Sequence, residues 1–126
     1  MKSIITVGDC NGIGMEVLFK ALWNIQTQSL LPNHTFSLCG NSATIIEYAQ
    51  KMGYEVSLQR ASIVLNKILE IPILEIEEYS PVQFGEITDS SARLAILSLE
   101  TAIQSTINRE FDAIVTMPIS KIALSQ

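Results

Sequence analysis

The chain has 126 residues, which is long enough for one domain with a buried core, and 48% of them are hydrophobic, which excludes a disordered chain. Its 8 basic and 13 acidic residues give a net charge of -5, and no basic patch indicates nucleic-acid binding. No apolar run approaches the roughly 18 residues of a membrane span, and the first residues lack the apolar region of a signal peptide. A cytoplasmic protein is therefore expected, with no nucleic-acid or membrane partner.

The first fifty residues alternate between strand and helix signals. Residues 3–7 and 35–39 are short β-rich runs, while residues 14–26 and the segment after Ser42 show helical spacing. Ser42 is expected to cap the second helix and Gly53 to end it. The predicted buried positions are Leu18, Ala21, Leu22 and Ile25 in the first helix and Ile45, Ile46, Ala49 and Met52 in the second.

The middle of the chain is less regular. Residues 54–58 predict a strand, residues 61–70 fit either a strand or a short helix, and residues 73–76 resume as a strand after an interruption at Pro72. Glu75 and Glu77 would share one face of that strand, and with Glu78 they form an acidic cluster that allows a metal site. A solvated sheet edge is the favoured interpretation.

Residues 89–107 show the strongest helical periodicity, with Asp89 or Ser90 as the expected N-cap and Arg93 on the surface, where it could reach an anionic ligand. The predicted buried positions are Ala92, Ala95, Ile96, Leu99, Ala102, Ile103 and Ile107. A strand at residues 112–116 follows, and residues 117–121 lead into another helix that Ser120 would cap. This alternation predicts an α/β fold in which a mostly parallel sheet lies between two helical layers.

Residues 4–16 join an apolar run to a helix through three glycines, Gly8, Gly12 and Gly14. In an α/β protein such a junction lies at the carboxyl end of a strand, where ligands bind, and glycines let the backbone approach a ligand closely. The spacing matches neither the dinucleotide fingerprint nor a Walker loop, and Asp9 and Glu16 disfavour a bare phosphate. The spacing supports a tight turn and a small-molecule site equally.

Thr116, Pro118 and Lys121 form a second junction of the same kind. Pro118 stiffens the turn, and Lys121 places a cation near the cleft, with a surface lysine as the alternative interpretation. Lys121 is the best candidate to touch an anionic group, and no residue of the chain is assigned as a catalytic base. The predicted cofactor or substrate cleft comprises Gly8, Asp9, Gly12, Gly14, Thr116, Pro118 and Lys121.

Cys10 and Cys39 lack the spacing of metal ligands. Two free thiols are expected, with a redox pair as the minor alternative. His34 is the single histidine, and it lies in a predicted loop, where solvent exposure is favoured over catalysis or metal ligation.

Four blocks together carry a resemblance to a known family: residues 5–16, residues 39–41 with 48–56, residues 84–85 with 91–92, and residues 112–124. In this order, over essentially the whole chain, they resemble 4-hydroxythreonine-4-phosphate dehydrogenase. The first block is shared in outline with isocitrate and isopropylmalate dehydrogenases, and residues 116–121 separate the two groups. The family usually has proline at the positions of Cys10 and Met15, alanine at Asn11 and Met117, and asparagine at Ser120.

The resemblance implies an isocitrate-dehydrogenase-like fold, a homodimer, and NAD- or NADP-dependent oxidation of 4-phosphooxy-threonine. Decarboxylation would then give 3-amino-2-oxopropyl phosphate, on the way to pyridoxal 5'-phosphate. The resemblance also implies a divalent metal, held by histidines from both subunits, that polarises the substrate oxygen while the nicotinamide accepts the hydride. Those histidines would lie beyond Leu124, so no metal ligand and no catalytic residue is assigned to this chain.

Residues 1–126 are accordingly expected to be the amino-terminal α/β segment of a longer two-domain enzyme, apparently truncated. We expect no dehydrogenase activity and no tight metal binding from the chain by itself, and self-association through apolar surface that other segments would cover. The alternatives are a related dehydrogenase for threonate or erythronate phosphate, a non-catalytic α/β binding module, and a phosphate acyltransferase of similar fold.

Overall fold

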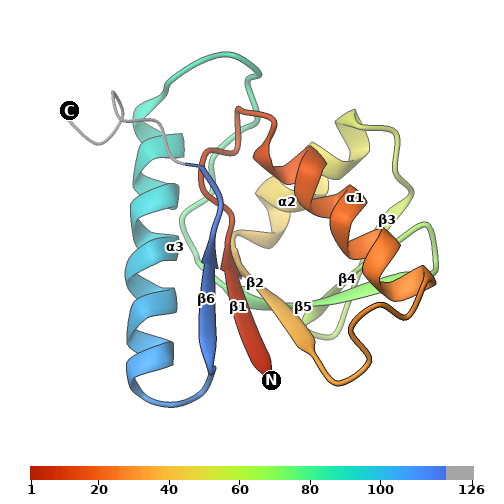
Figure 1. Ribbon diagram of the computed structural model, residues 1–126. Helices are drawn as coiled ribbons and strands as arrows, with labels where there is room; N and C mark the ends of the chain where they lie inside the picture. The colour runs from red at the N-terminus through yellow and green to blue at the C-terminus, as the bar shows by residue number, and fades with distance from the viewer. Residues whose placement is uncertain (119–126) are drawn as a thin grey trace.

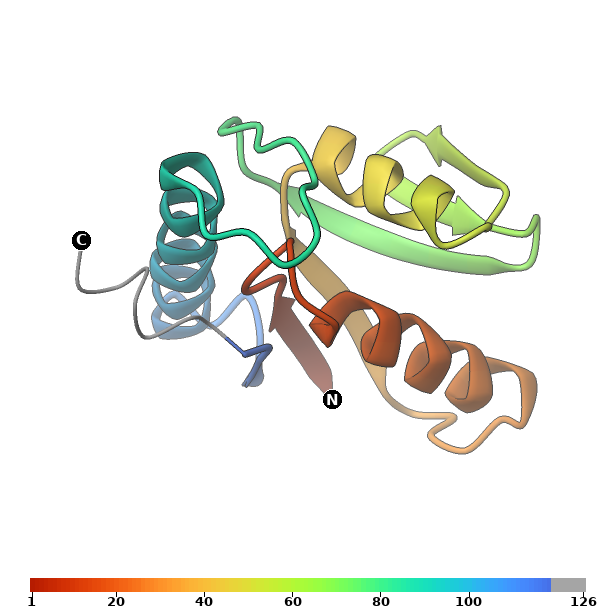
Figure 2. The same ribbon diagram turned by 90° about the horizontal axis from the view of Figure 1, so that it is seen from above.

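A six-stranded sheet lies between two helical layers (Figure 1 and Figure 2). The computed structural model describes residues 1–118, so the helix expected after Pro118 lies outside the described residues. One face of the sheet is covered by α1 and α2 and the other by α3. In chain order the elements are β1 (Lys2–Thr6), α1 (Gly14–Thr27), β2 (Thr35–Gly40), α2 (Ser42–Lys51), β3 (Val56–Gln59), β4 (Ser62–Leu65), β5 (Leu69–Glu75), α3 (Asp89–Ile107) and β6 (Ala113–Thr116).

The strand order is β3-β4-β5-β2-β1-β6. β1 pairs in parallel with β2 and β6, and β2 pairs in parallel with β5, while β3, β4 and β5 are joined by antiparallel ladders. The three-layer α/β fold with a mostly parallel sheet is therefore confirmed. Because parallel strands end at the same edge, the segments that follow β1 and β6 leave the sheet next to each other.

The ambiguous segment at residues 61–70 belongs to an antiparallel hairpin formed by β4 and β5. The prediction that Pro72 interrupts the strand is wrong, because β5 runs through it. Pro72 pairs with Ser62 of β4, whereas the next residue, Ile73, pairs with Leu38 of β2. The missing N–H of Pro72 thus falls where β5 changes from one ladder to the other.

The N-cap predicted for α2 is wrong by one residue. Asn41 is the cap, because its side chain accepts a hydrogen bond from the Thr44 amide over 3.0 Å, and Ser42 is the first helical residue. Asn41 also donates to the carbonyl oxygen of Ile76, which ties the start of α2 to the end of β5.

The N-cap predicted for α3 is wrong as well, since neither Asp89 nor Ser90 takes that position. Thr88 is the cap, and it forms a capping box with Ser91, in which each side chain accepts a hydrogen bond from the other's backbone N–H. Two orphan amides at the start of the helix are satisfied in this way.

Two apolar clusters flank the sheet, the larger under α1 and α2 and the smaller under α3. The buried residues of the first two helices are Met15, Leu18, Phe19 and Leu22 in α1 and Thr44, Ile45, Tyr48 and Ala49 in α2. Ala21, which was predicted to be buried, is exposed, and Ile25, Ile46 and Met52 are only half-buried.

The buried face of α3 differs from the predicted apolar stripe. The residues that face the sheet are Ser91, Leu94, Ala95, Ser98, Ala102 and Ser105. Ala95 and Ala102 were predicted correctly, but Ile103 and Ile107 are 42% and 67% exposed. At 19 residues α3 is the longest described helix, and no helix within residues 1–118 has both the length and the apolar character that a membrane crossing needs.

Candidate functional site

The two predicted junctions meet at the carboxyl edge of the sheet. The Asp9 amide donates a hydrogen bond to the Pro118 carbonyl oxygen over 2.9 Å. The Met117 amide donates to the Thr6 carbonyl oxygen over 3.3 Å, at the end of the β1–β6 ladder. The predicted cleft residues that lie at this edge are Gly8, Asp9, Gly12, Gly14, Thr116 and Pro118, while Lys121 lies outside the described residues.

The glycines of the first junction make room for other parts of the same chain. Gly8 has a φ of +67°, and a Cβ there would lie 2.6 Å from the Pro118 carbonyl oxygen and 2.8 Å from that of Met117. A Cβ on Gly14 would lie 3.3 Å from Cδ of Pro118. Gly8 is therefore explained by the contact between the two junctions, without invoking close approach to a ligand, whereas Gly14 only lies close to the Pro118 ring.

Asn11 attaches a third segment, residues 80–88, to the glycine junction. Its Oδ1 accepts a hydrogen bond from the Gln83 amide over 2.7 Å, and its Nδ2 donates to the Glu86 carbonyl oxygen over 3.0 Å. Its backbone oxygen accepts from the Gly85 amide, and its own amide donates to Oδ1 of Asp9 over 2.9 Å. Because Asn11 is only 3% exposed, these bonds hold the junction and the loop together as one unit.

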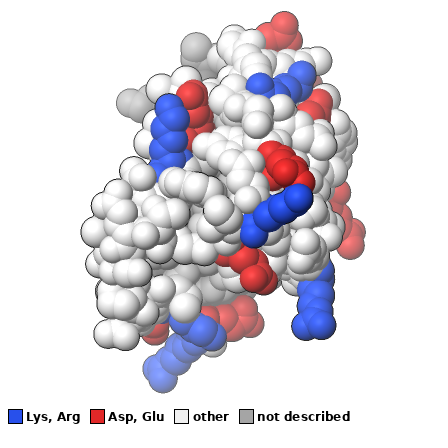
Figure 3. Space-filling view, turned by 90° about the vertical axis from the view of Figure 1, so that its right-hand side faces the viewer, with Lys and Arg blue, Asp and Glu red and all other residues white. Residues whose placement is uncertain are grey.

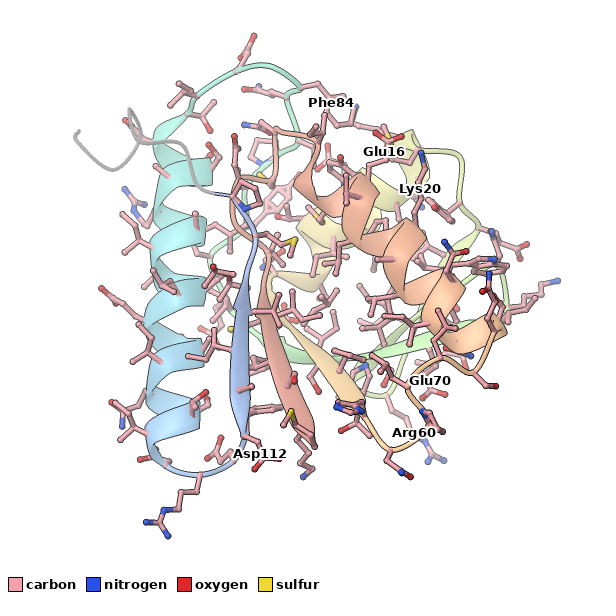
Figure 4. The ribbon with its side chains drawn as sticks, viewed as in Figure 1. Glu16, Lys20, Arg60, Glu70, Phe84 and Asp112 are labelled. Atoms are coloured by element: carbon pink, nitrogen blue, oxygen red, sulfur yellow. The ribbon has the colours of Figure 1, made fainter. Side chains whose placement is uncertain are left out.

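Tyr48, on α2, contacts the glycine junction. Its hydroxyl donates a hydrogen bond to the Gly12 carbonyl oxygen over 2.9 Å, and burial raises the pKa of this phenol above its ordinary value. The edge of its ring meets Phe84, with ring centroids 5.3 Å apart. Phe84 is 46% exposed and lies over the start of α1, near Glu16 (Figure 4).

Charges near the junction are acidic or paired. Glu16 forms an ion pair with Lys20 over 3.3 Å on the exposed side of α1 (Figure 4), and the Asp9 carboxylate accepts the Asn11 amide. On the face seen in Figure 3, basic and acidic side chains are interspersed, so this face presents no large field of one sign. An anionic ligand at the junction would need an additional cation, and Lys121, the residue predicted to supply one, lies outside the described residues.

The acidic cluster after β5 is engaged by the chain itself. Glu75 accepts hydrogen bonds from the amide and the hydroxyl of Ser42, over 3.1 and 3.0 Å, at the start of α2. Glu78 forms an ion pair with Arg93 over 2.8 Å. Within residues 1–118 no three His, Cys, Asp or Glu side chains gather where they could hold a metal ion. A catalytic metal therefore does not fit the described residues, and no chemical step through a metal is assigned to them.

Cys10 and Cys39 are free and buried, which confirms the two free thiols. They belong to the clusters on opposite faces of the sheet. Burial raises the pKa of both thiols, and that of Cys39 rises from 9.0 to about 11. Both side chains therefore stay protonated at neutral pH, and neither is placed as a nucleophile.

The raised pKa of Cys39 predicts a loss of stability at alkaline pH. In the unfolded chain this thiol ionises near 9.0, whereas the folded chain keeps it protonated to about 11, so the folded state holds more protons in that window. The free energy of unfolding should fall across the window, by about 3 kcal/mol for this group. Urea unfolding from pH 8 upward should show a shallower decline for Cys39→Ala. Equal pH slopes for the two proteins would contradict the prediction.

Sequence analysis did not identify Asn11 and Tyr48, the two residues whose side chains hold the glycine junction by hydrogen bonds. Their partners lie 36 to 75 residues away in the chain, so no local spacing pattern reveals them. The one available signal was that Asn11 stands where the resembled family usually has alanine. His34 is exposed, as predicted, and lies just before β2, at the opposite end of the strands from the two junctions.

Residues 26–126 match the family model described as "Pyridoxal phosphate biosynthetic protein PdxA". The chain belongs to this family. The PdxA assignment agrees with the resemblance found in the sequence, and the match includes residues 112–124, the most distinctive block.

Individual relatives agree with the PdxA assignment. A 4-hydroxythreonine-4-phosphate dehydrogenase from Sulfurihydrogenibium sp. (strain YO3AOP1) is 30% identical over 124 residues, covering 96% of this chain and 36% of the relative. A protein from Cutibacterium acnes (strain DSM 16379 / KPA171202), provisionally named D-threonate 4-phosphate dehydrogenase, is 26% identical and covers 95% of this chain and 36% of that relative. The chain thus spans about a third of the length of the curated relatives it matches.

A solved structure shows the same fold. The crystal structure of a 4-hydroxythreonine-4-phosphate dehydrogenase from Burkholderia phymatum superposes with a TM-score of 0.79 at 23% identity, covering 98% of this chain and 38% of that one. The fold is therefore part of the isocitrate-dehydrogenase-like fold of the PdxA dehydrogenases.

Proposed function

We propose that this chain supplies one wall of the active-site cleft of a PdxA-type dehydrogenase. Residues 1–126 would be the amino-terminal segment of a longer, two-domain, homodimeric and cytoplasmic enzyme. The observation that carries the proposal is the contact between the glycine junction and Met117–Pro118, because it lies at the carboxyl edge, where α/β enzymes bind their ligands. The names of the relatives support the dehydrogenase class.

The proposed reaction is NAD- or NADP-dependent oxidation of 4-phosphooxy-threonine followed by decarboxylation, in the biosynthesis of pyridoxal 5'-phosphate. This chain would position the substrate and the cofactor rather than react with them. Asn11 and Tyr48 fix the backbone of the glycine junction, so that one wall of the cleft is preorganised. Lys121 would contact an anionic group of the substrate or the cofactor. The divalent metal and the reacting groups would be held by segments of the enzyme that this chain does not span.

A second candidate is a dehydrogenase for a related phosphorylated hydroxy acid, such as threonate or erythronate phosphate. The Cutibacterium acnes relative favours it, because its printed name is that of a D-threonate 4-phosphate dehydrogenase. The departures at Cys10, Met15 and Met117 lie on the two junctions that would shape the substrate cleft, and the fourth departure, Ser120, lies outside the described residues.

A chimera tests the function. The matched segment of the Sulfurihydrogenibium dehydrogenase would be replaced by this chain, and NADH formation would be followed with 4-phosphooxy-threonine and with threonate 4-phosphate. We expect the chimera to oxidise one of them, and the purified chain alone, with added divalent metal, to oxidise neither. The higher kcat/KM identifies the substrate.

Lys121→Ala in the chimera should raise KM for the substrate or the cofactor about tenfold, the effect of losing one charge-assisted hydrogen bond. An unchanged KM for both the substrate and the cofactor would show that Lys121 does not contact either of them. Chelator-sensitive turnover by the purified chain would overturn the view that its reactive groups lie elsewhere. A folded, dimeric chimera that converts neither compound would favour the non-catalytic binding module.

A further inference from the structure

A cavity of about 570 Å³ lies between α1 and the sheet, at the amino ends of β2 and β5. Four segments of the chain form it, namely α1, the loop from α1 to β2, and the first residues of β2 and of β5. Its volume is within the range of about 300–1,000 Å³ that small-molecule sites occupy. The two junctions lie at the other end of the strands, so the cavity belongs to neither of them.

The cavity results from the way β5 is paired. The ladder between β2 and β5 begins only at Leu38 and Ile73. Before that point, residues 69–72 of β5 pair with β4 and residues 35–37 of β2 pair with β1, so the two strands are not joined to each other. Figure 2 shows β5, in green, diverging from β2, in orange, in this part of the sheet. The opening is therefore made by the described chain itself and not by a missing neighbour of an edge strand.

The walls of the cavity are mostly apolar. Leu22 of α1 and Leu69 and Ile71 of β5 line it and belong to the buried core. The rings of His34 and Phe36 line the side formed by β2 and lie nearly parallel, with an angle of 18° between their planes and centroids 6.4 Å apart. Aliphatic and aromatic walls of this kind favour a ligand with an apolar body.

Two hydrogen-bond acceptors accompany these walls. Glu70 is the one acidic side chain of the lining, which contains neither lysine nor arginine. None of the ion pairs within residues 1–118 involves Glu70, and Arg60, labelled beside it in Figure 4, forms none with it. Gln26 is held by a hydrogen bond from its Nε2 to the Ile68 carbonyl oxygen over 3.0 Å, which leaves its Oε1 to accept another.

The carboxyl end of α1 adds negative potential to the cavity. Ser29, which directly follows the C-cap residue Gln28, belongs to the lining. The carboxyl end of a helix carries a partial negative charge, and the last turn of α1 contains no basic residue that would offset it. Glu70, Gln26 and this helix end therefore all favour a cation, and they disfavour a carboxylate or a phosphate group.

We propose that this cavity binds a small amphiphilic cation, an apolar body that carries one protonated amine. The apolar body would lie against Leu22, Leu69 and Ile71, and the ammonium group would donate hydrogen bonds to the Glu70 carboxylate and to Oε1 of Gln26. An anion would have to approach Glu70 without a compensating cation. An uncharged ligand of the same shape would lack the charge-assisted hydrogen bond.

Nuclear magnetic resonance on the chain, labelled at its isoleucine methyl groups, tests the proposal, with Ile25 and Ile71 as reporters in the cavity. The probes are phenethylammonium, the uncharged 2-phenylethanol and the anion 3-phenylpropionate, at pH 8, where imidazole groups are ordinarily neutral. We expect phenethylammonium to shift both methyl signals with a millimolar dissociation constant, about fivefold lower than that of 2-phenylethanol. We expect 3-phenylpropionate to shift neither signal.

Glu70→Gln should abolish the preference for the cation. The dissociation constant of phenethylammonium should rise about fivefold, because the ion pair is lost, while that of 2-phenylethanol stays unchanged. Glu100→Gln is the matched control, since it removes the same charge from an exposed position on α3, which covers the other face of the sheet. Ile25→Trp should fill the cavity and prevent the shift of Ile71 by every probe.

Thermal unfolding must show that the variants fold, and Thr35→Trp, at an exposed position of the lining, replaces Ile25→Trp if that variant does not. The same titration on the folded chimera shows whether the cavity stays open in the longer enzyme, and loss of binding there would overturn the proposal. Equal binding of the three probes, preference for the anion, or no shift of Ile25 and Ile71 up to the solubility limit of phenethylammonium would overturn it too, as would an unchanged preference in Glu70→Gln. Methyl shifts are read without turnover, so the proposed function is judged separately.

Discussion

Gly8→Ala is expected to lower the free energy of unfolding by about 3 kcal/mol or more, through two separate costs. The φ of +67° at Gly8 is unfavourable for alanine, and the new Cβ would lie 2.6 Å from the Pro118 carbonyl oxygen. That oxygen accepts the hydrogen bond of the Asp9 amide, so it cannot move away without breaking the link between the junctions. Urea unfolding measures the loss.

Gly53→Ala separates the two costs. Gly53 has a φ of +88°, but a Cβ there would meet nothing within 4 Å. Only the backbone strain remains, and we expect a loss of about 1 kcal/mol. If Gly8→Ala cost no more than Gly53→Ala, the contact between the junctions would not be needed for stability. Gly8→Ala in the active chimera should also lower kcat/KM, because the displaced segment is the proposed cleft wall.

Local sequence patterns were sufficient for most of the fold, because strands and helices alternate and each carries an apolar face. They failed on α3, where the buried face contains Ser91, Ser98 and Ser105, spaced by seven residues. A count of apolar residues assigns such serines to solvent. Small side chains at these positions let α3 lie close to the strands, and the larger residues Ile103 and Ile107 remain outside.

Pro72 and the helix caps failed for a related reason. A proline ends a strand where its missing N–H would have donated a hydrogen bond to the neighbouring strand. Pro72 lies at the point where the pairing partner of β5 changes from β4 to β2, so β5 continues through it. Asn41 and Thr88 were overlooked in favour of adjacent polar residues, and only backbone geometry separates the cap from the first helical turn.

The location of the candidate site could be predicted from the sequence, but the contacts that shape it could not. Both junctions follow strands that were predicted to lie in one parallel sheet, so their meeting at one edge follows from the fold. The reason for Gly8 did not follow, because its constraint is the backbone of residues 117–118, more than a hundred positions away. Asn11 was visible only as a departure from the resembled family.

Asn11→Ala is expected to lower the free energy of unfolding by about 3 kcal/mol and to release residues 83–86 from the junction. The change leaves the Gln83 amide and the Glu86 carbonyl oxygen without their partners, and each unsatisfied buried group costs about 1–3 kcal/mol. Hydrogen exchange should show faster exchange at the amides of both Gln83 and Gly85, although the Gly85 amide binds the backbone oxygen of residue 11.

The Gly85 amide is the decisive probe, because its acceptor survives the substitution. If only Gln83 exchanged faster, the loop would be held by its backbone and by the Phe84–Tyr48 contact, and Asn11 would contribute a single hydrogen bond. Gln104→Ala is the control, since its side chain bonds Asn108 on the exposed surface of α3 and should cost less than about 0.5 kcal/mol. Faster exchange at both amides in Asn11→Ala, with no change in Gln104→Ala, would establish Asn11 as the residue that positions this wall of the cleft.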